Sequence, residues 1–240
     1  MKTTLRWTLS VGLVLASGLT TLGKSVAATS SETGLTITIH VHNYAQVDQK
    51  MLTEAEEVTT GVFRKAGVKT RWVDTAATPA TGQEISSSQG SVDLSHITLS
   101  ILPASMAERL GRRGNVMGLA PGSGRDRFLV YVFYNVVEAL GQTQAKARLE
   151  GSSYRQATPG QILGHAIAHE VGHLMLNMEI HSGNGIMRGG WNLKDLQDAS
   201  YSCLLFTPQQ AGVIRAEVLR RVHGPEGSEV VGIESANLTR

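Results

Sequence analysis

A short motif at residues 169–173 constrains this chain more than any other feature of its 240 residues. The motif reads H-E-x-x-H and places His169 and His173 four residues apart, with Glu170 between them. Residues four apart on a helix lie on one face, one turn from each other, so both imidazoles can reach one metal ion. Zinc binds imidazole nitrogen at about 2.0 to 2.1 Å. The motif therefore predicts a helix that carries two zinc ligands.

The residues around the motif predict where this helix begins and that it is packed in a core. Thr158 and Gln161 form a capping box, and Pro159 stands at the first helical position. H-E-x-x-H also occurs by chance in exposed amphipathic helices, so its surroundings matter. Here the neighbours are apolar, which favours a metal site: Ile162, Leu163, Ile167, Val171, Leu174 and Met175.

Glu170 is the candidate general base. In a site of this kind the glutamate takes a proton from a zinc-bound water, the water attacks a carbonyl carbon, and the metal stabilises the oxyanion. His165 continues the row of histidines at four-residue spacing. It lies about 12 Å along the helix axis from His173, so one ion cannot bind both. We expect His165 to be a core histidine or to support a ligand.

The run from His165 to Trp191 resembles the metzincin zinc peptidases. Their pattern is H-E-x-x-H-x-x-G-x-x-H, followed by a turn with a methionine beneath the metal. His169, Glu170 and His173 match this pattern residue by residue. The same run is similar to a group of bacterial secreted metzincin-like proteins, through Gly185-Ile186-Met187-Arg188 and Trp191.

The resemblance also implies a role for the methionine of the turn. Ser182 follows a histidine, and Ile186-Met187 stands a few residues further on, as in the matrixin-type continuation of the pattern. Met187 would then be the Met-turn residue and form an apolar floor below the zinc, although methionine also commonly fills gaps in a core. Some metzincins carry a tyrosine two residues after this methionine, where the present chain has Gly189.

The family pattern does not supply the third ligand, because the sequence departs from it after His173. Leu176 replaces the glycine, and Glu179 stands at the position of the third histidine. In the family that glycine ends the helix in a left-handed conformation, which leucine resists and Asn177 tolerates. If the helix turns at Asn177, His181 follows the turn at nearly the family's spacing. A neutral imidazole there also lowers the pKa of zinc-bound water more than a carboxylate ligand would. We predict His181 as the third ligand, with Glu179 or a two-histidine site as alternatives.

The rest of the chain predicts an α+β fold with an α/β-like start. Strands at 35–42 and 68–73 flank a helix at 46–66, and this β-α-β order favours a parallel pair. The resemblance implies a metzincin-like twisted mixed sheet with this crossover helix, a central zinc-binding helix, a Met-turn and a C-terminal helix. Further strands are expected at 97–102, 115–120 and 128–133, and further helices at 105–110 and 208–222.

A substrate strand follows from the same resemblance. Metzincins bind an extended peptide through main-chain hydrogen bonds to the edge strand above the zinc. By the order of elements, the candidate edge strand here is 115–120. Its residues Gly118, Leu119 and Ala120 are the candidate substrate contacts. The expected substrate is a peptide or protein.

Residues 1–28 have the layout of a secretory signal peptide. Lys2 and Arg6 precede an uncharged apolar run, and small residues lead to a cleavage site after Ala27 or Ala28. We expect a secreted or periplasmic protein, with an uncleaved membrane anchor as the alternative. The segment carries three basic residues and no acid, so without it the formal net charge of +2 becomes −1. With this charge we expect no nucleic-acid partner. The rest of the sequence has no second apolar run long enough to span a bilayer, so we expect no stable membrane insertion after cleavage.

The remaining residues divide into a metzincin-like catalytic domain at 29–223 and a loosely ordered tail at 224–240. The space between the signal peptide and the first strand is too short for a propeptide. We therefore expect a protein that is active once exported or is controlled by an external inhibitor. Cys203 is the only cysteine, so no internal disulfide can form, and we expect it to be a buried small hydrophobe.

These features together predict a secreted zinc metallopeptidase with one catalytic zinc ion. Two alternatives remain, a zinc hydrolase of another amide bond and a non-catalytic, zinc-stabilised binding protein. Glu170 favours an enzyme, because a structural zinc site needs no base and is normally closed by a fourth protein ligand.

Overall fold

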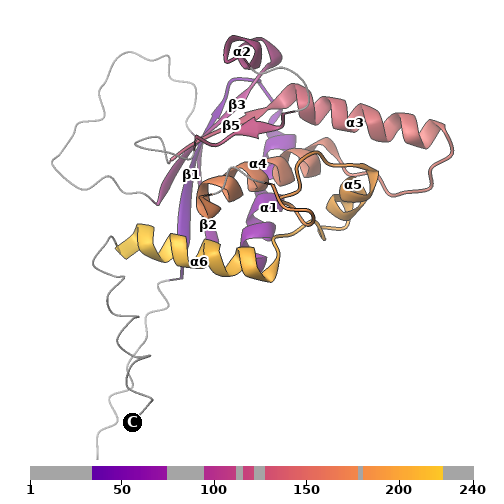
Figure 1. The fold of residues 1–240 in the computed structure, drawn as a ribbon. Coiled ribbons are helices and arrows are strands. Elements are labelled where there is room, and N and C mark those ends of the chain that lie inside the picture. Colours follow the sequence, from indigo (N-terminus) through magenta and orange to yellow (C-terminus); the bar gives the residue numbers. More distant parts are fainter. Residues whose placement is uncertain (1–33, 75–94, 112–115, 122–127, 178–180, 224–240) are drawn as a thin grey trace, which may run out of the picture. The chain divides into compact units, whose positions relative to one another are not determined.

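The structure, a computed structural model, describes residues 34–74, 95–111, 116–121, 128–177 and 181–223. Five strands form one mixed sheet in the order β2-β1-β3-β5-β4, and six helices accompany it among these residues (Figure 1). The coarse prediction of a mixed α and β fold is confirmed. The predicted signal peptide, the predicted tail and Glu179 lie outside the described residues. The elements are β1 (Thr36–Asn43), α1 (Gln49–Lys65), β2 (Lys69–Asp74), β3 (His96–Leu102), α2 (Ala104–Arg109), β4 (Gly118–Leu119), β5 (Leu129–Phe133), α3 (Tyr134–Leu149), α4 (Pro159–Leu176), α5 (Leu193–Ser200) and α6 (Pro208–His223).

The first three elements form the predicted parallel β-α-β unit. In β1, Ile37, Ile39 and Val41 are at most 2% exposed and alternate with polar residues, as expected for one buried face of a sheet. The Asp48 side chain accepts a hydrogen bond from the Met51 amide and caps α1. β1 pairs in parallel with both β2 and β3, and β3 pairs in parallel with β5. The predicted parallel pairing of the first two strands is therefore confirmed.

The helix that carries the motif, α4, is the central helix of the core. It begins at the predicted capping box of Thr158 and Gln161, and fifteen of its eighteen residues are buried. It ends at Leu176, and Asn177 takes the left-handed conformation with φ 51° and ψ 40°. This confirms the predicted extension of the helix to Asn177. The helix packs on α1, where the Thr59 hydroxyl donates to the Gly164 carbonyl at 2.8 Å.

Two helices were not predicted. α3 follows β5 directly, and its only buried residues are Val136, Val137 and Gln144, which is too few for a clear periodic pattern. α5 begins at a capping box of Asn192 and Asp195. Although α4 is strongly apolar, no helix of the described residues is long and apolar enough to cross a membrane.

The prediction for Cys203 is wrong. The side chain is exposed, and its Sγ donates to the Tyr201 carbonyl at 3.4 Å. Cys203 follows the end of α5, where Ser202 has a positive φ of 56° and turns the chain. A local turn of this kind leaves the thiol at the surface in spite of its apolar sequence neighbours.

Candidate metal centre

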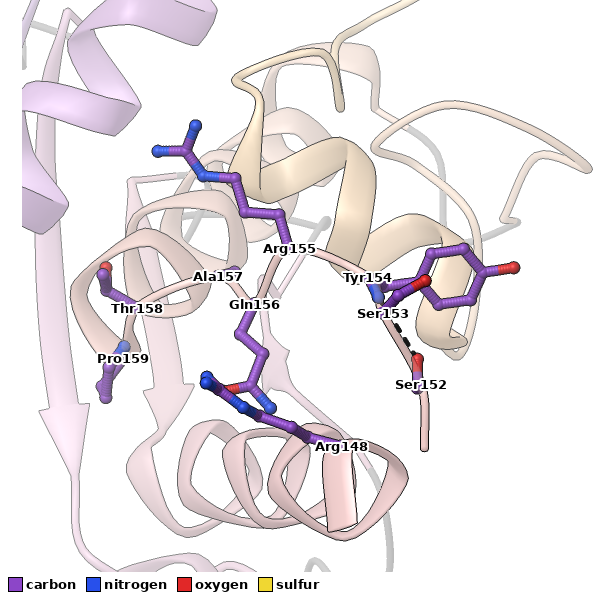
Figure 2. Close-up of a pocket in the computed structure, with 9 residues that line it drawn as sticks. All are labelled: Arg148, Ser152, Ser153, Tyr154, Arg155, Gln156, Ala157, Thr158 and Pro159. Atoms are coloured by element: carbon purple, nitrogen blue, oxygen red, sulfur yellow. Dashed lines mark hydrogen bonds between the residues drawn. The ribbon is translucent and has the colours of Figure 1, made fainter. Parts of the chain in front are cut away.

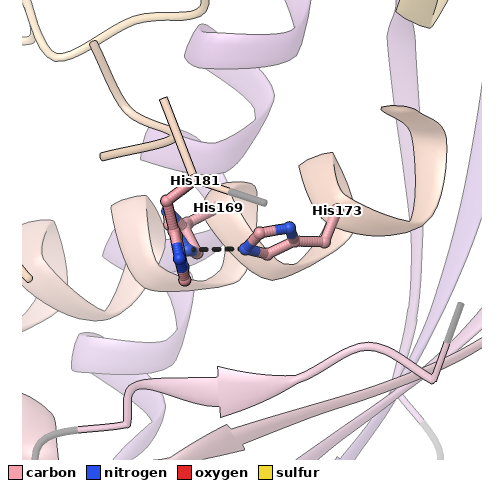
Figure 3. A group of neighbouring side chains, drawn as sticks. All are labelled: His169, His173 and His181. Atoms are coloured by element: carbon pink, nitrogen blue, oxygen red, sulfur yellow. Dashed lines mark hydrogen bonds between the residues drawn. The ribbon is translucent and has the colours of Figure 1, made fainter. Parts of the chain in front are cut away.

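Three histidines converge beside the C-terminal half of α4. His169 and His173 come from the helix, and His181 follows it in the chain (Figure 3). Their ligand atoms all lie within 4.8 Å of one another, and the Nε2 atoms of His169 and His173 are 3.0 Å apart. The three histidines differ in burial: His169 is buried, His173 is half-buried and His181 is exposed. One small ion could therefore contact all three imidazoles, with access from the solvent side.

His169 is held in one orientation by the segment that follows the cluster. Its Nδ1 donates to the Ile186 carbonyl at 2.7 Å, which leaves Nε2 without a proton and directed at His173. The Trp191 indole Nε1 donates to the same carbonyl at 3.4 Å. Burial lowers the pKa of His169 to about 3, against the smaller raising effect of the hydrogen bond to Ile186, and the neighbouring histidines lower it further. His169 is therefore neutral at pH 7, as a metal ligand must be.

The donor set fits zinc. Two nitrogens bonded to one tetrahedral zinc ion at 2.0 to 2.1 Å are about 3.3 Å apart, close to the 3.0 Å between His169 and His173. No fourth histidine, cysteine, aspartate or glutamate of the described residues joins the group. Three protein ligands with an open fourth position are typical of catalytic zinc sites, whereas structural sites are closed.

Glu170 lies deep beside the histidines, against the edge strand. The residue is 4% exposed, and burial raises its pKa to about 8. A Cβ atom on Gly118 of β4 would stand 2.6 Å from Glu170 Cγ and 2.7 Å from Cδ. The carboxyl end of Glu170 therefore occupies space that any other residue at position 118 would fill.

Two of the predicted substrate residues lie at the edge of the sheet that the described residues form. Among these residues β4 pairs only with β5, in antiparallel register, and stands last in the strand order. It is shorter than the predicted strand, since only Gly118 and Leu119 are paired, and Ala120 follows the strand. The contact of Gly118 with Glu170 brings this edge against α4 one residue after His169.

His165 lies outside the cluster, as expected. Its side chain is fully buried, and Nδ1 donates to the Gln161 carbonyl at 2.7 Å. The rings of His165 and Trp191 are nearly perpendicular, with the centroids 6.4 Å apart. Burial lowers the pKa of His165 to about 4, in spite of the opposing hydrogen bond to Gln161. His165 is thus a neutral core histidine one turn before His169.

Met187 packs beneath the helix between the two helical histidines. It is 1% exposed, and a Cβ atom on Gly172 would stand 2.7 Å from the Met187 sulfur. The thioether therefore contacts α4 at Gly172, one residue before His173.

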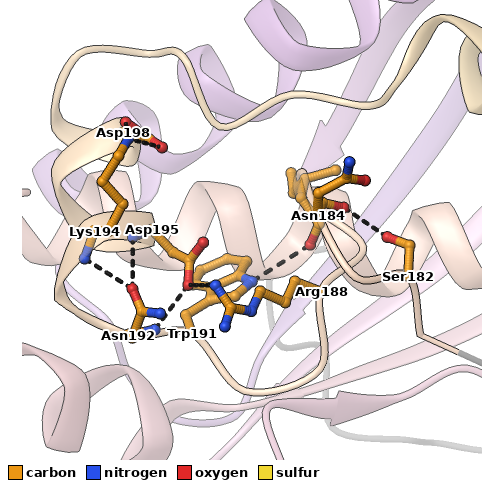
Figure 4. A network of polar contacts seen from close by, with 9 residues as sticks. Ser182, Asn184, Arg188, Trp191, Asn192, Lys194, Asp195 and Asp198 are labelled. Carbon is orange, nitrogen blue, oxygen red and sulfur yellow. Dashed lines mark hydrogen bonds and ion pairs between the residues drawn. The ribbon is translucent and has the colours of Figure 1, made fainter.

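A polar network that the sequence analysis missed fixes the segment around Met187. Arg188 pairs with the buried Asp195 at 3.3 Å, and Asp195 also accepts the Asn192 amide at 2.8 Å (Figure 4). The Ser182 amide donates to the Met187 carbonyl at 2.8 Å. The Asn192-x-x-Asp195 spacing is a capping signal in the sequence that could have predicted α5 and its buried carboxylate. The network ties the turn below the histidines to α5.

A cavity of about 640 Å³ lies away from the histidines, where α3 ends and α4 begins (Figure 2). Arg148 and Arg155 are among its lining residues, and the Arg155 guanidinium lies 5.3 Å from the centroid of the Tyr201 ring. Because His169 is ten residues from Pro159 at this end of α4, about 15 Å of helix separates the cavity from the cluster. The cavity therefore does not belong to the candidate metal centre.

No protein-family model matches the chain, and no curated protein sequence matches it. The basis for a functional assignment is therefore the chemistry of the histidine cluster, Glu170 and the edge strand.

Proposed function

We propose that the protein is a zinc-dependent peptidase of metzincin type. The observation that carries the proposal is the convergence of His169, His173 and His181 within 4.8 Å beside the buried Glu170. Two features support the metzincin type. Met187 packs against α4 at Gly172, and the C-terminal helix α6 follows later in the chain. The predicted signal peptide supports action outside the cytoplasm, in the secreted or periplasmic compartment.

The proposed chemistry divides between the ion and the chain. A zinc ion held by the three histidines would supply Lewis acidity, for the peptide carbonyl and for a water molecule. Glu170 takes the proton of the attacking water and returns it to the leaving amine. Its pKa of about 8 belongs to the metal-free site, and the charge of a nearby cation favours the ionised carboxylate. The Ile186 carbonyl keeps the proton of His169 on Nδ1, away from the metal.

The edge position of β4 supports an extended peptide as substrate. A strand at the end of a sheet offers unpaired main-chain groups to a further strand. Because Gly118 of β4 touches the side chain of Glu170, a peptide paired with β4 would pass beside the general base. This arrangement favours cleavage within a polypeptide chain.

Glu170→Gln tests the proposal. We expect the zinc-loaded parent to cleave a mixed peptide library and to stop when the metal is chelated. Glu170→Gln should bind zinc as the parent does and cleave about 10²- to 10⁴-fold more slowly, the usual contribution of general acid–base catalysis. Glu150→Gln, which changes an exposed carboxyl after α3, is the matched control and should cleave at the parent rate.

Three outcomes would contradict the proposal. Cleavage by Glu170→Gln at the parent rate would exclude Glu170 as the base. Cleavage that survives chelation would exclude the metal. Zinc binding without cleavage of any peptide would favour the alternatives, a hydrolase of another amide bond or a zinc-stabilised binding protein.

A further inference from the structure

The His181 ring lies directly against the backbone of Gly189. A Cβ atom on residue 189 would stand 2.7 Å from His181 Cγ, 2.9 Å from Nδ1 and 3.1 Å from Cβ. Carbon atoms in van der Waals contact are about 3.5 to 4.0 Å apart. Any side chain at position 189 would therefore displace His181.

Rotation of the imidazole cannot relieve this contact. Two of the three close atoms, Cβ and Cγ, are at the base of the His181 side chain, on the axis about which the ring turns. The whole side chain would have to shift, and its ligand atom would shift with it. That atom now lies within 4.8 Å of those of His169 and His173.

The backbone of the turn is poorly placed to give way instead. The Arg188 amide donates to the Gly185 carbonyl at 3.2 Å, and the Ile186 amide donates to the Leu205 carbonyl at 3.0 Å. The Arg188 side chain is paired with Asp195 on α5 (Figure 4). Strain introduced at residue 189 would thus fall on His181, which is exposed.

We propose that Gly189 is a positioning residue for the metal centre, because its lack of a side chain gives the His181 imidazole the place from which it reaches the metal. This proposal rests on the metal site of the proposed function. A side chain at position 189 weakens metal binding through His181 alone and leaves His169 and His173 in place, since both stand on α4 and His169 is also held by the Ile186 carbonyl.

The test measures zinc affinity by competition with a chromophoric chelator for the parent and four variants. The variants are Gly189→Ala, His181→Ala, their combination, and the control Gly183→Ala. Gly183 lies in the same segment, and a Cβ atom there would meet nothing within 4 Å. Thermal unfolding of each metal-free protein shows whether the fold is retained.

We expect Gly189→Ala to lower zinc affinity about 10- to 100-fold, the usual cost of disturbing the partner of a metal ligand. Gly183→Ala should bind zinc as the parent does. In the His181→Ala background, Gly189→Ala should cause no further loss, and the metal-free Gly189→Ala protein should unfold at the parent's temperature.

Parent-like zinc affinity in Gly189→Ala would overturn the proposal, and so would an equal loss with and without His181. A parent that binds no zinc would overturn both this proposal and the proposed function. If the affinities follow the expected pattern but no peptide is cleaved, the role of Gly189 stands and only the peptidase activity fails.

Discussion

His169 and His181 belong to the same histidine cluster but lie in opposite kinds of surroundings. His169 is 1% exposed on a helix whose residues are nearly all buried, and its ring is fixed by the Ile186 carbonyl. His181 is exposed, and its ring lies over Gly189 in a hydrogen-bonded turn. The helical histidine is therefore part of the core, whereas the histidine after the helix is held locally. Changes on the helix should affect both stability and metal binding, and changes at the turn should affect metal binding alone.

The largest effect is expected for His169→Ala. The change opens a cavity in the core and removes the hydrogen bond to Ile186, which should cost about 2 to 4 kcal/mol of unfolding free energy. Zinc binding should also be lost. Denaturant unfolding of the metal-free protein and a zinc titration measure the two effects. Unchanged metal-free stability would show that the helix ligand is not part of the core.

His165→Leu should change how stability depends on pH. The pKa of His165 is about 4 in the folded protein and about 6.5 in the unfolded chain. The unfolded state therefore binds the proton first, so the stability present above pH 6.5 is lost as the pH falls to 4, by on the order of 3 kcal/mol.

The measurement is denaturant unfolding at several pH values, with chelator present to remove any contribution from metal release. The difference in stability between the parent and His165→Leu isolates this residue, because the buried His169 is present in both. That difference should change between pH 6.5 and 4 and stay constant above pH 7. If the unfolding free energies of the parent and His165→Leu fell in parallel between pH 6.5 and 4, the burial of a neutral His165 would be contradicted.

His181→Ala should reduce zinc affinity by more than about 100-fold, beyond the cost of disturbing an outer partner. The metal-free protein should keep its stability to within about 0.5 kcal/mol, as is usual for an exposed residue. Glu179→Ala is the comparison that separates the two candidate third ligands, and it should bind zinc as the parent does. A loss of affinity in Glu179→Ala, with none in His181→Ala, would reverse the ligand choice.

Met187→Leu should have the smallest effect. Leucine has nearly the volume of methionine, so the change under α4 should cost less than about 1.5 kcal/mol and leave zinc bound. Thermal unfolding and a zinc titration measure the two. Complete loss of zinc in this variant would show that the thioether acts on the metal by more than packing.

The sequence predicted the helical half of the site well, because the signals there are local. The capping box of Thr158 and Gln161 marks the start of α4, and the tolerance of Asn177 for the left-handed conformation marks its end. The strands of the β-α-β unit were also visible, since their apolar residues alternate.

The other half could not be read in the same way, because its structure depends on contacts between residues distant in the chain. The fit of His181 over Gly189 and the hydrogen bond from His169 to Ile186 have no local sequence pattern. α3 was missed because most of its surface faces solvent. Cys203 was misplaced for a local reason, since its apolar neighbours do not reveal the turn at Ser202.

Anomalous diffraction at the zinc edge from crystals of the zinc-loaded protein would test the central claim most directly. We expect one zinc ion bonded to imidazole nitrogens of His169, His173 and His181 at about 2.0 to 2.1 Å, with the fourth position open to solvent. Zinc bound by a carboxylate of Glu179 in place of His181, or bound away from α4, would contradict the account.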